Sequence, residues 1–158
     1  MLIPRERSRP QVLLVEDDPD SAEAIRLLLD YEGYTVAWLA TGAEALARLD
    51  GPSLDAPPPV AILLDLGLPD MSSPILEREV ARRAARIPPV VVLSAAPEPT
   101  IRRVAAAMGA FAALRKPCDA DALLATLARI AARRDGPMGG PASSRPALAR
   151  PTGPGLNH

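Results

Sequence analysis

The sequence predicts an α/β fold in which a parallel, five-stranded sheet is covered by helices on both faces. Two observations support this fold class. Short apolar runs alternate along the chain with segments of helical pattern, five of each. The apolar runs show almost no alternation with polar residues, which is typical of strands buried on both faces of a parallel sheet. A chain of 158 residues is long enough for one such domain.

The predicted strands are short and rich in Val, Leu, Ile and Ala. Because aromatic residues make up only 3% of the chain, the core has to be built from aliphatic side chains. The first strand is followed at once by acidic residues, and the third carries Asp65 near its carboxyl end. We expect the strands at residues 11–15, 34–39, 60–66, 90–94 and 111–115.

The helices are predicted from their first residues as well as from their apolar faces. Asp18-Pro19 is typical of a helix start, because Asp caps the first turn and Pro fits its first position. The segment 41–44 fits a capping box. We expect Pro97 and Pro99 to delay the fourth helix. The helices are expected from 19 to near 33, from 42 to before 51, from 74 to about 86, from 101 to 108, and from 120 to about 134.

Both ends of the chain are expected to lie outside the folded domain, which we place at residues 11–134. Residues 1–10 are charged and have no apolar core, so they are interpreted as a disordered arm. Residues 135–158 are rich in Gly, Pro and Ser and cannot bury enough apolar surface to offset their ordering entropy. We interpret them as a disordered tail and expect no second folded domain after it.

Composition argues against several classes of function. A net charge of −1 gives little attraction for nucleic acid, and no apolar run approaches the ~20 residues needed to cross a membrane. The N-terminal residues do not form a secretory signal. Cys118 is the only cysteine, which fits a reducing, cytoplasmic location. His158 is the only histidine, which argues against a Ser-His-Asp triad or a histidine-rich zinc site.

Polar residues gather where the predicted strands end. Glu16 and Asp17 follow the first strand, Asp65 ends the third, Ser94 ends the fourth and Lys116 follows the fifth. Ligand sites of open parallel sheets lie beyond the carboxyl ends of the strands, so these five side chains are expected to meet. Three carboxylates repel one another, and a hard divalent cation such as Mg²⁺ is their natural partner.

This set of groups suits phosphoryl transfer to a carboxylate. Asp65 would act as the nucleophile and form an aspartyl phosphate. Lys116, the only lysine of the chain, would contact a phosphoryl oxygen as a compact charge, and the Ser94 hydroxyl would donate a hydrogen bond to another. A bound Mg²⁺ would neutralise the incoming group.

Four runs of the sequence resemble receiver domains of two-component response regulators. They are VLLVEDDPD (12–20), ILLDLGLPDM (62–71), VVVLSA (90–95) and GAFAALRKP (109–117). The resemblance covers roughly residues 10–134 and implies a flavodoxin-like, doubly wound sheet with strand order 2-1-3-4-5. It also implies a phosphorylation switch that catalyses only its own phosphorylation and dephosphorylation.

The resemblance implies a role for each site residue. Asp65 would be the phosphoacceptor, Asp17 a direct Mg²⁺ ligand, and Glu16 a ligand through water. The Gly67 carbonyl would complete the metal site with Asp65. Ser94 would be the switch hydroxyl, and Lys116 would be the conformational lysine, followed by a cis peptide bond to Pro117.

The resemblance also implies partners. A histidine kinase or phosphotransfer protein would supply the phosphoryl group. Because no output domain is predicted, a stand-alone receiver would signal through another protein or as a homodimer. The surface formed by the fourth helix, fifth strand and fifth helix is the one the family usually employs. Neither nucleic acid nor membrane is expected to bind.

The sequence departs from the family pattern at several positions. Ser72-Ser73 stands where Asp-Gly is usual, and Ser tolerates the backbone conformation of that Gly less well. Either the loop is built differently, or Ser73 caps a helix starting at Pro74. Ala113 stands at the position of the switch aromatic, with Phe111 expected on the same side of the strand. These differences put the coupling of the site to the output surface in doubt.

Two further positions bear on the lifetime of the phosphoryl group. Gly67 and Ala96 lie two residues beyond Asp65 and Ser94, where family members often carry larger or polar side chains. We expect an open path for water to the acyl phosphate.

Three alternative functions remain open. A pseudo-receiver would keep the fold as an interaction module without phosphorylation. A haloacid-dehalogenase-like phosphatase also uses an aspartyl nucleophile, but such enzymes place a second Asp where this chain has Gly67. A flavodoxin-like cofactor binder is disfavoured because no Gly-rich or Ser/Thr-rich phosphate loop follows the first strand.

Overall fold

A computed structural model describes residues 8–52 and 57–135 of the chain. Within these ranges, five strands alternate with five helices. The strands are β1 (Gln11–Val15), β2 (Thr35–Leu39), β3 (Ala61–Asp65), β4 (Val90–Ser94) and β5 (Ala112–Arg115). The helices are α1 (Pro19–Tyr31), α2 (Gly42–Asp50), α3 (Ser73–Arg83), α4 (Glu98–Met108) and α5 (Ala120–Asp135).

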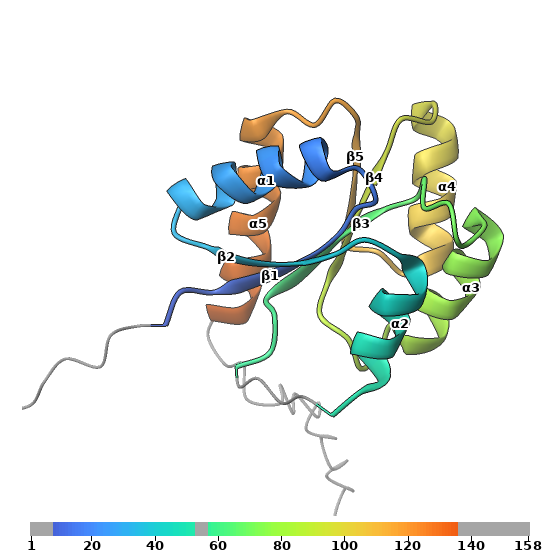
Figure 1. Ribbon diagram of the computed structural model, residues 1–158, viewed down its shortest axis with the longest axis horizontal. Helices are drawn as coiled ribbons and strands as arrows, with labels where there is room; N and C mark the ends of the chain where they lie inside the picture. The colour runs from blue at the N-terminus through green and yellow to red at the C-terminus, as the bar shows by residue number, and fades with distance from the viewer. Residues whose placement is uncertain (1–7, 53–56, 136–158) are drawn as a thin grey trace, which may run out of the picture.

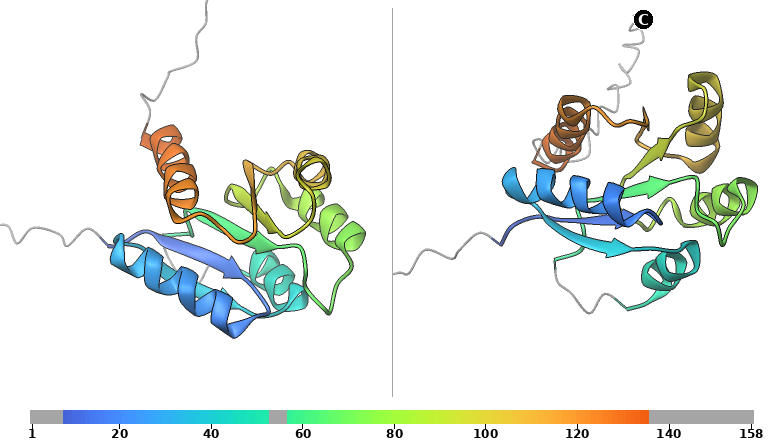
Figure 2. Two further views of the ribbon diagram at one scale, coloured as in Figure 1. Left: turned by 90° about the horizontal axis from the view of Figure 1, so that it is seen from above. Right: turned by 45° about the horizontal axis from the view of Figure 1, so that its top comes forward.

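The strands form one parallel sheet in the order β2-β1-β3-β4-β5, which confirms the predicted fold class and strand order. Helices α1 and α5 cover one face, while α2, α3 and α4 cover the other (Figures 1 and 2). All carboxyl ends of the strands therefore point to the same edge of the sheet, and all amino ends to the opposite edge.

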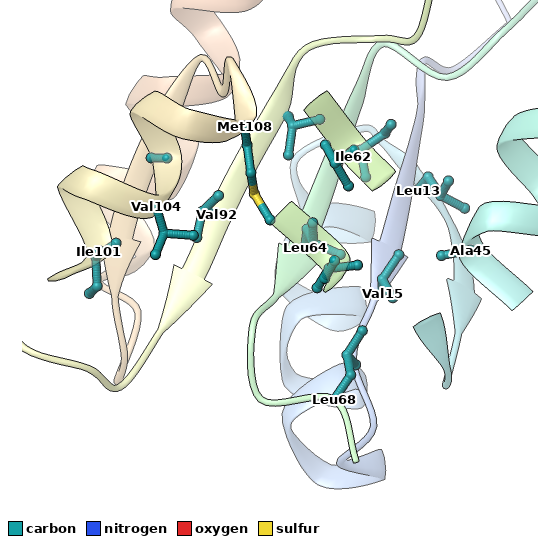
Figure 3. Close-up of a cluster of buried hydrophobic side chains, with 14 residues drawn as sticks. Leu13, Val15, Ala45, Ile62, Leu64, Leu68, Val92, Ile101, Val104 and Met108 are labelled. Carbon is teal, nitrogen blue, oxygen red and sulfur yellow. The ribbon is translucent and has the colours of Figure 1, made fainter. Parts of the chain in front are cut away.

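The core is aliphatic and is divided by the sheet into two clusters. Figure 3 shows the cluster beneath α2 and α4, in which alternate residues of β1 and β3, such as Val15 and Leu64, pack against Ala45 and Met108. The other cluster joins the remaining strand residues to α1 and α5, with Leu29 and Leu127 among its members. Strands β3 and β4 are buried at every position, as their apolar runs predict. Each buried Leu, Ile or Val contributes about 1.5–3 kcal/mol relative to an exposed one.

Two of the predicted helix starts are confirmed in detail. The Asp18 carboxylate caps α1 by accepting hydrogen bonds from the backbone N–H groups of Asp20 and Ser21, both at 3.3 Å. The Thr41 hydroxyl accepts from the N–H of Glu44 at 3.1 Å at the start of α2. These bonds satisfy amides that the helix itself leaves without partners.

Two expectations about helix starts are wrong. Pro97 and Pro99 do not delay α4, which begins at Glu98 rather than Ile101, because the first turn of a helix needs no intrahelical N–H donor. Ser73 does not cap α3. It is the first residue of that helix, and Ser72 occupies the cap position without a side-chain hydrogen bond.

The expectation that Phe111 and Ala113 share one side of the last strand is also wrong. Phe111 precedes β5, whose first residue is Ala112, and it packs into the cluster beneath α1 and α5. Ala113 packs against the cluster on the opposite face. Alternation of side chains between the two faces holds within a strand and does not extend to the bend before it.

The predicted arm and tail fall largely on residues 1–7 and 136–158, which lie outside the described residues. Ser8 to Pro10 have no regular secondary structure, and Asp135 is the last residue of α5. None of the helices in the described ranges has the length and apolar character needed to span a membrane.

Candidate functional site

The carboxyl edge of the sheet carries the polar residues that the sequence places at strand ends. Glu16 follows β1 directly, Asp65 is the last residue of β3, Ser94 is the last of β4, and Lys116 follows β5 directly. Because the strands are parallel and in register, these positions lie on one edge. The fold therefore gathers residues that are separated by up to 100 positions in the chain.

Three carboxylates meet at this edge. Oxygen atoms of Glu16, Asp17 and Asp65 all lie within 4.8 Å of one another. Glu16 is completely buried and Asp65 is 5% exposed, whereas Asp17 is exposed at the rim. We call this cluster the acidic cup; two of its acids are buried and the third, Asp17, faces solvent.

Lys116 is the cation of this cup. Its Nζ atom donates a hydrogen bond to Oε2 of Glu16 at 2.6 Å and lies 3.2 Å from Oδ2 of Asp65. The second carboxylate oxygen of Asp65, Oδ1, accepts a hydrogen bond from the N–H of Gly67 at 3.0 Å. Asp65 is thus held in one orientation by the Lys116 side chain, which follows β5, and by the loop that follows its own strand.

The electrostatics of the cup follow from burial and from its imbalance of charge. Burial raises the pKa of Glu16, and the hydrogen bond from Lys116 only partly opposes this. Burial lowers the pKa of Lys116, but its hydrogen bond to Glu16 and the charge of Asp65 outweigh that effect and leave the pKa raised. Lys116 therefore stays protonated, and one ammonium faces three carboxylates.

The residues of the cup fit a divalent cation. Carboxylate oxygens are hard ligands of the kind that Mg²⁺ prefers, and the exposed rim leaves room for its waters. The loop after Asp65 passes close to the carboxylate, because a Cβ atom added at Gly67 would lie 3.5 Å from Oδ1. A residue without a side chain at this position keeps the loop close to the cup without covering it.

Ser94 lies at the same edge without contacting the charged groups. It is 7% exposed, and its hydroxyl accepts a hydrogen bond from the N–H of Ala96 at 3.1 Å. The peptide bond between Lys116 and Pro117 is cis, as expected. The structure thus brings Glu16, Asp17, Asp65 and Lys116 together, with Ser94 on the neighbouring strand end.

Two residues next to the cup were missed by the sequence analysis. Asp70, in the loop between β3 and α3, accepts hydrogen bonds from the N–H groups of Gly42 at 2.9 Å and Ala43 at 3.0 Å. It therefore fastens this loop to the start of α2. The indole of Trp38 donates to the carbonyl of Glu16 at 2.7 Å. Neither contact has a local sequence signal, although Trp38 is the only tryptophan of the chain.

The strand order and the acidic cup with its lysine together define a receiver-type α/β domain. The family model described as the response regulator receiver domain matches residues 12–128 of this chain. The chain therefore belongs to the family of response regulator receiver domains of two-component signalling.

Curated relatives support this membership. The chain is 38% identical over 124 residues to the transcriptional regulatory protein KdpE of Mycobacterium tuberculosis, an alignment that covers 78% of this chain and 51% of that protein. It is 34% identical over 129 residues to the cell cycle transcriptional regulator CtrA of Caulobacter vibrioides, covering 80% of this chain and 52% of the relative. The chain thus spans about half the length of these relatives.

Solved structures show the same fold. A response regulator receiver protein from Burkholderia phymatum is 32% identical, with a TM-score of 0.64, over 77% of this chain and 94% of that one. The Francisella response regulator 1452 receiver domain matches with a TM-score of 0.66 over 79% of this chain and 98% of its own, at 23% identity. The second likeness supports the fold alone.

Proposed function

We propose that this chain is a signalling switch that accepts a phosphoryl group on Asp65. The observation that carries the proposal is the position of the Lys116 ammonium, 3.2 Å from an oxygen of Asp65 inside a cup of three carboxylates. No packing requirement explains a lysine and three acids at the end of an apolar sheet. A site that has to hold both a cation and a phosphoryl group does explain them.

The residues of the cup have separate tasks in this reaction. An oxygen of Asp65 attacks the phosphorus of the donor, the bond from phosphorus to the donor's leaving group breaks, and an aspartyl phosphate remains. Lys116 already lies beside Asp65, so its ammonium can contact an oxygen of the transferred group as the charge moves. The Ser94 hydroxyl, on the neighbouring strand end, would donate a hydrogen bond to another phosphoryl oxygen.

Mg²⁺ is the cofactor that this donor set favours. Asp17 and Asp65 would bind it directly, Glu16 through water, and the Gly67 carbonyl would supply a further oxygen. When bound, the ion supplies positive charge that offsets the negative charge of the phosphoryl oxygens. Within the chain itself, Lys116 neutralises only part of the charge of the three acids.

The donor in this proposal is the phosphohistidine of a histidine kinase or a phosphotransfer protein, reached in the cytoplasm. The phosphorylated state would act by shifting the domain between two conformations and so changing its affinity for another protein. The surface formed by α4, β5 and α5 is the proposed place of that contact. The alignments cover only about half of the relatives named as transcriptional regulators, so output through protein contact is part of the proposal.

Mass spectrometry of the intact protein after incubation with acetyl phosphate and Mg²⁺ tests the switch. We expect one phosphoryl group on the wild type and none on Asp65→Ala. Asp119→Asn is the matched control, because it removes an exposed carboxylate that follows Lys116 but lies outside the cup, and it should be labelled normally. Labelling that persists in Asp65→Ala, or an unlabelled wild type, would contradict the proposal.

Two alternative functions predict other results. A pseudo-receiver would remain unlabelled while binding its partner with or without Asp65. A phosphatase of the haloacid dehalogenase type would turn over a phosphomonoester, but Gly67 offers no carboxylic acid to protonate the leaving group. The charged cup favours the switch over both.

A further inference from the structure

A second polar feature lies at the opposite edge of the sheet from the acidic cup. A surface hollow of about 380 Å³ is bounded by the loop that leads into β4, the loop that leads into β5, and the last turns of α5. Val90, the first residue of β4, lines this hollow, whereas Ser94 at the other end of the same strand faces the cup. The two features are therefore separated by the length of the strands.

Two arginines on α5 lean over one aromatic ring at this hollow. The guanidinium carbons of Arg129 and Arg133 lie 5.2 and 5.0 Å from the centroid of Phe111, the only phenylalanine of the chain. Such cation–π contacts hold a guanidinium in place and offset part of the repulsion between two like charges one helical turn apart. The ring thus fixes two exposed cations side by side.

These arginines have no acidic partner among the described residues. Elsewhere, exposed arginines pair with a Glu on their own helix: Arg26 with Glu23 and Arg102 with Glu98, each at 2.6 Å. No acid stands three or four residues before Arg129 or Arg133, and no acidic residue lines the hollow. Two positive charges are therefore presented together without compensation.

The rest of the hollow has an apolar wall, and the backbone N–H groups just before β5 are already hydrogen-bonded. Ile87, Pro88 and Pro89 form one wall, and the two prolines have no N–H to donate. The N–H groups of Ala110 and Phe111 are already bonded to the carbonyls of Ala105 and Val90. A ligand that fits must bring negative charge for the guanidiniums and an apolar group for the prolines.

We propose that this hollow, the Arg129–Phe111–Arg133 site, docks an acidic segment of a partner protein. A carboxylate of that segment lies between the two guanidiniums, which match carboxylate oxygens in two-pronged hydrogen bonds. A neighbouring apolar side chain of the segment packs on Ile87 and Pro88. The docking needs no phosphoryl group on Asp65, because the site lies at the other edge of the sheet.

Two other occupants fit the site less well. A symmetric contact between two copies would set this patch near its own image, so that unpaired arginines face each other. Single-stranded nucleic acid uses exposed aromatic faces on which bases stack, but the ring of Phe111 is already covered by Arg129 and Arg133. The net charge of −1 adds no general attraction for nucleic acid.

Fluorescence anisotropy with labelled hexapeptides tests the site on the full chain. The probe alternates Glu and Leu, and its control alternates Gln and Leu. We expect the acidic peptide to bind and the neutral one not to bind. The double variant Arg129→Gln/Arg133→Gln should lower the affinity at least tenfold. The matched variant Arg103→Gln/Arg134→Gln removes the same charge from exposed arginines outside the hollow and should change the affinity less than twofold.

A charge-reversal variant tests the role of charge directly, because it should change which peptide binds. Arg129→Glu/Arg133→Glu should lose the acidic peptide and gain affinity for a peptide that alternates Lys and Leu. Circular dichroism of each variant checks that it is folded. Acetyl phosphate labelling of Asp65 should be unchanged in all of them, so failure of the switch and failure of this docking site are separately visible.

Several results would overturn the proposal. They are no binding of the acidic peptide by the wild type, equal losses in the double variant and its matched control, and stronger binding of a single-stranded DNA oligomer that displaces the peptide. A concentration-dependent dimer of the wild type that Arg129→Gln/Arg133→Gln abolishes would assign the site to a second copy instead.

Discussion

Two clusters of buried charge in this domain differ in whether their acids are all paired with cations. Arg83, the last residue of α3, has its side chain 8% exposed and forms ion pairs with Asp50 at 2.6 Å and Glu79 at 2.8 Å. Further arginines reach the same two acids from the exposed helix surface, so both acids are paired with cations and the extra positive charge faces solvent. In the acidic cup, one lysine faces three carboxylates.

This difference separates a structural cluster from a candidate functional one. The Arg83 cluster ties the end of α2 to α3, and its charges are satisfied within the chain. The cup has excess negative charge that none of the described residues neutralises, which is costly unless a cation binds. Burial alone would not distinguish them, since both clusters contain charged groups that are more than nine-tenths buried. Buried negative charge that exceeds the positive charge available to pair with it is the signal of a ligand site.

The largest expected effect comes from removing the cation of the cup. Lys116→Met should slow phosphorylation by acetyl phosphate about 100-fold, because a positioned donor to a developing negative charge is worth about that much. The measurement is the labelling rate in the presence of Mg²⁺, with circular dichroism to show that the protein is folded. Arg83→Met serves as the control and should be labelled at the wild-type rate. Equal slowing in both variants would remove the distinction between the clusters.

Removing Arg83 should lower the stability of the domain without affecting phosphorylation. Arg83→Met is expected to lower the free energy of unfolding by about 2 kcal/mol, less than for a fully buried pair, since Asp50 keeps contact with solvent. Urea denaturation measures this change. Arg82→Met removes an exposed arginine that contacts the same Glu79 and should cost less than about 0.5 kcal/mol. If the two variants lost the same stability, burial of Arg83 would not matter.

The same cluster should make stability depend on pH on the acidic side. Hydrogen bonds from Arg83 hold the pKa values of Asp50 and Glu79 below their ordinary values of 3.8 and 4.5. For groups whose pKa is depressed in the folded state, the stabilisation is complete above the unfolded pKa and is lost as pH falls through the folded one. The free energy of unfolding should therefore decline below about pH 4.5, and less steeply in Arg83→Met. Parallel curves for the two proteins would contradict this linkage.

The smallest expected effect concerns access of water to the cup. A side chain at position 67 would begin 3.5 Å from Oδ1 of Asp65, so a long apolar one would cover the acyl phosphate. Gly67→Met should lengthen the lifetime of phosphorylated Asp65 roughly threefold, a change below 1 kcal/mol in barrier height. The lifetime is measured after removal of acetyl phosphate, with Ala95→Met as a nearby exposed control. An unchanged lifetime would show that the path of water does not pass over Gly67.

Local patterns made the fold and most of the cup predictable. Short apolar runs such as Val90–Ser94 are typical of buried parallel strands, and parallel strands bring their carboxyl ends to one edge. Placing Asp65 and Lys116 at strand ends was therefore enough to predict that they meet. The errors arose where a short segment can adopt more than one backbone conformation. Examples are the prolines at the start of α4 and Phe111 before β5.

The sequence by itself determined the order of strands and helices, the aliphatic core and the set of groups available at the carboxyl edge, because these depend on periodicity and chain order. Only the tertiary structure decided which charges are neutralised. The Asp70 bonds to α2, the pairing of Arg83 with Asp50, and the two arginines over Phe111 join elements whose relative positions follow from packing. Side-chain contacts between such elements have no periodic signature, since their distances are set by how the helices settle on the sheet.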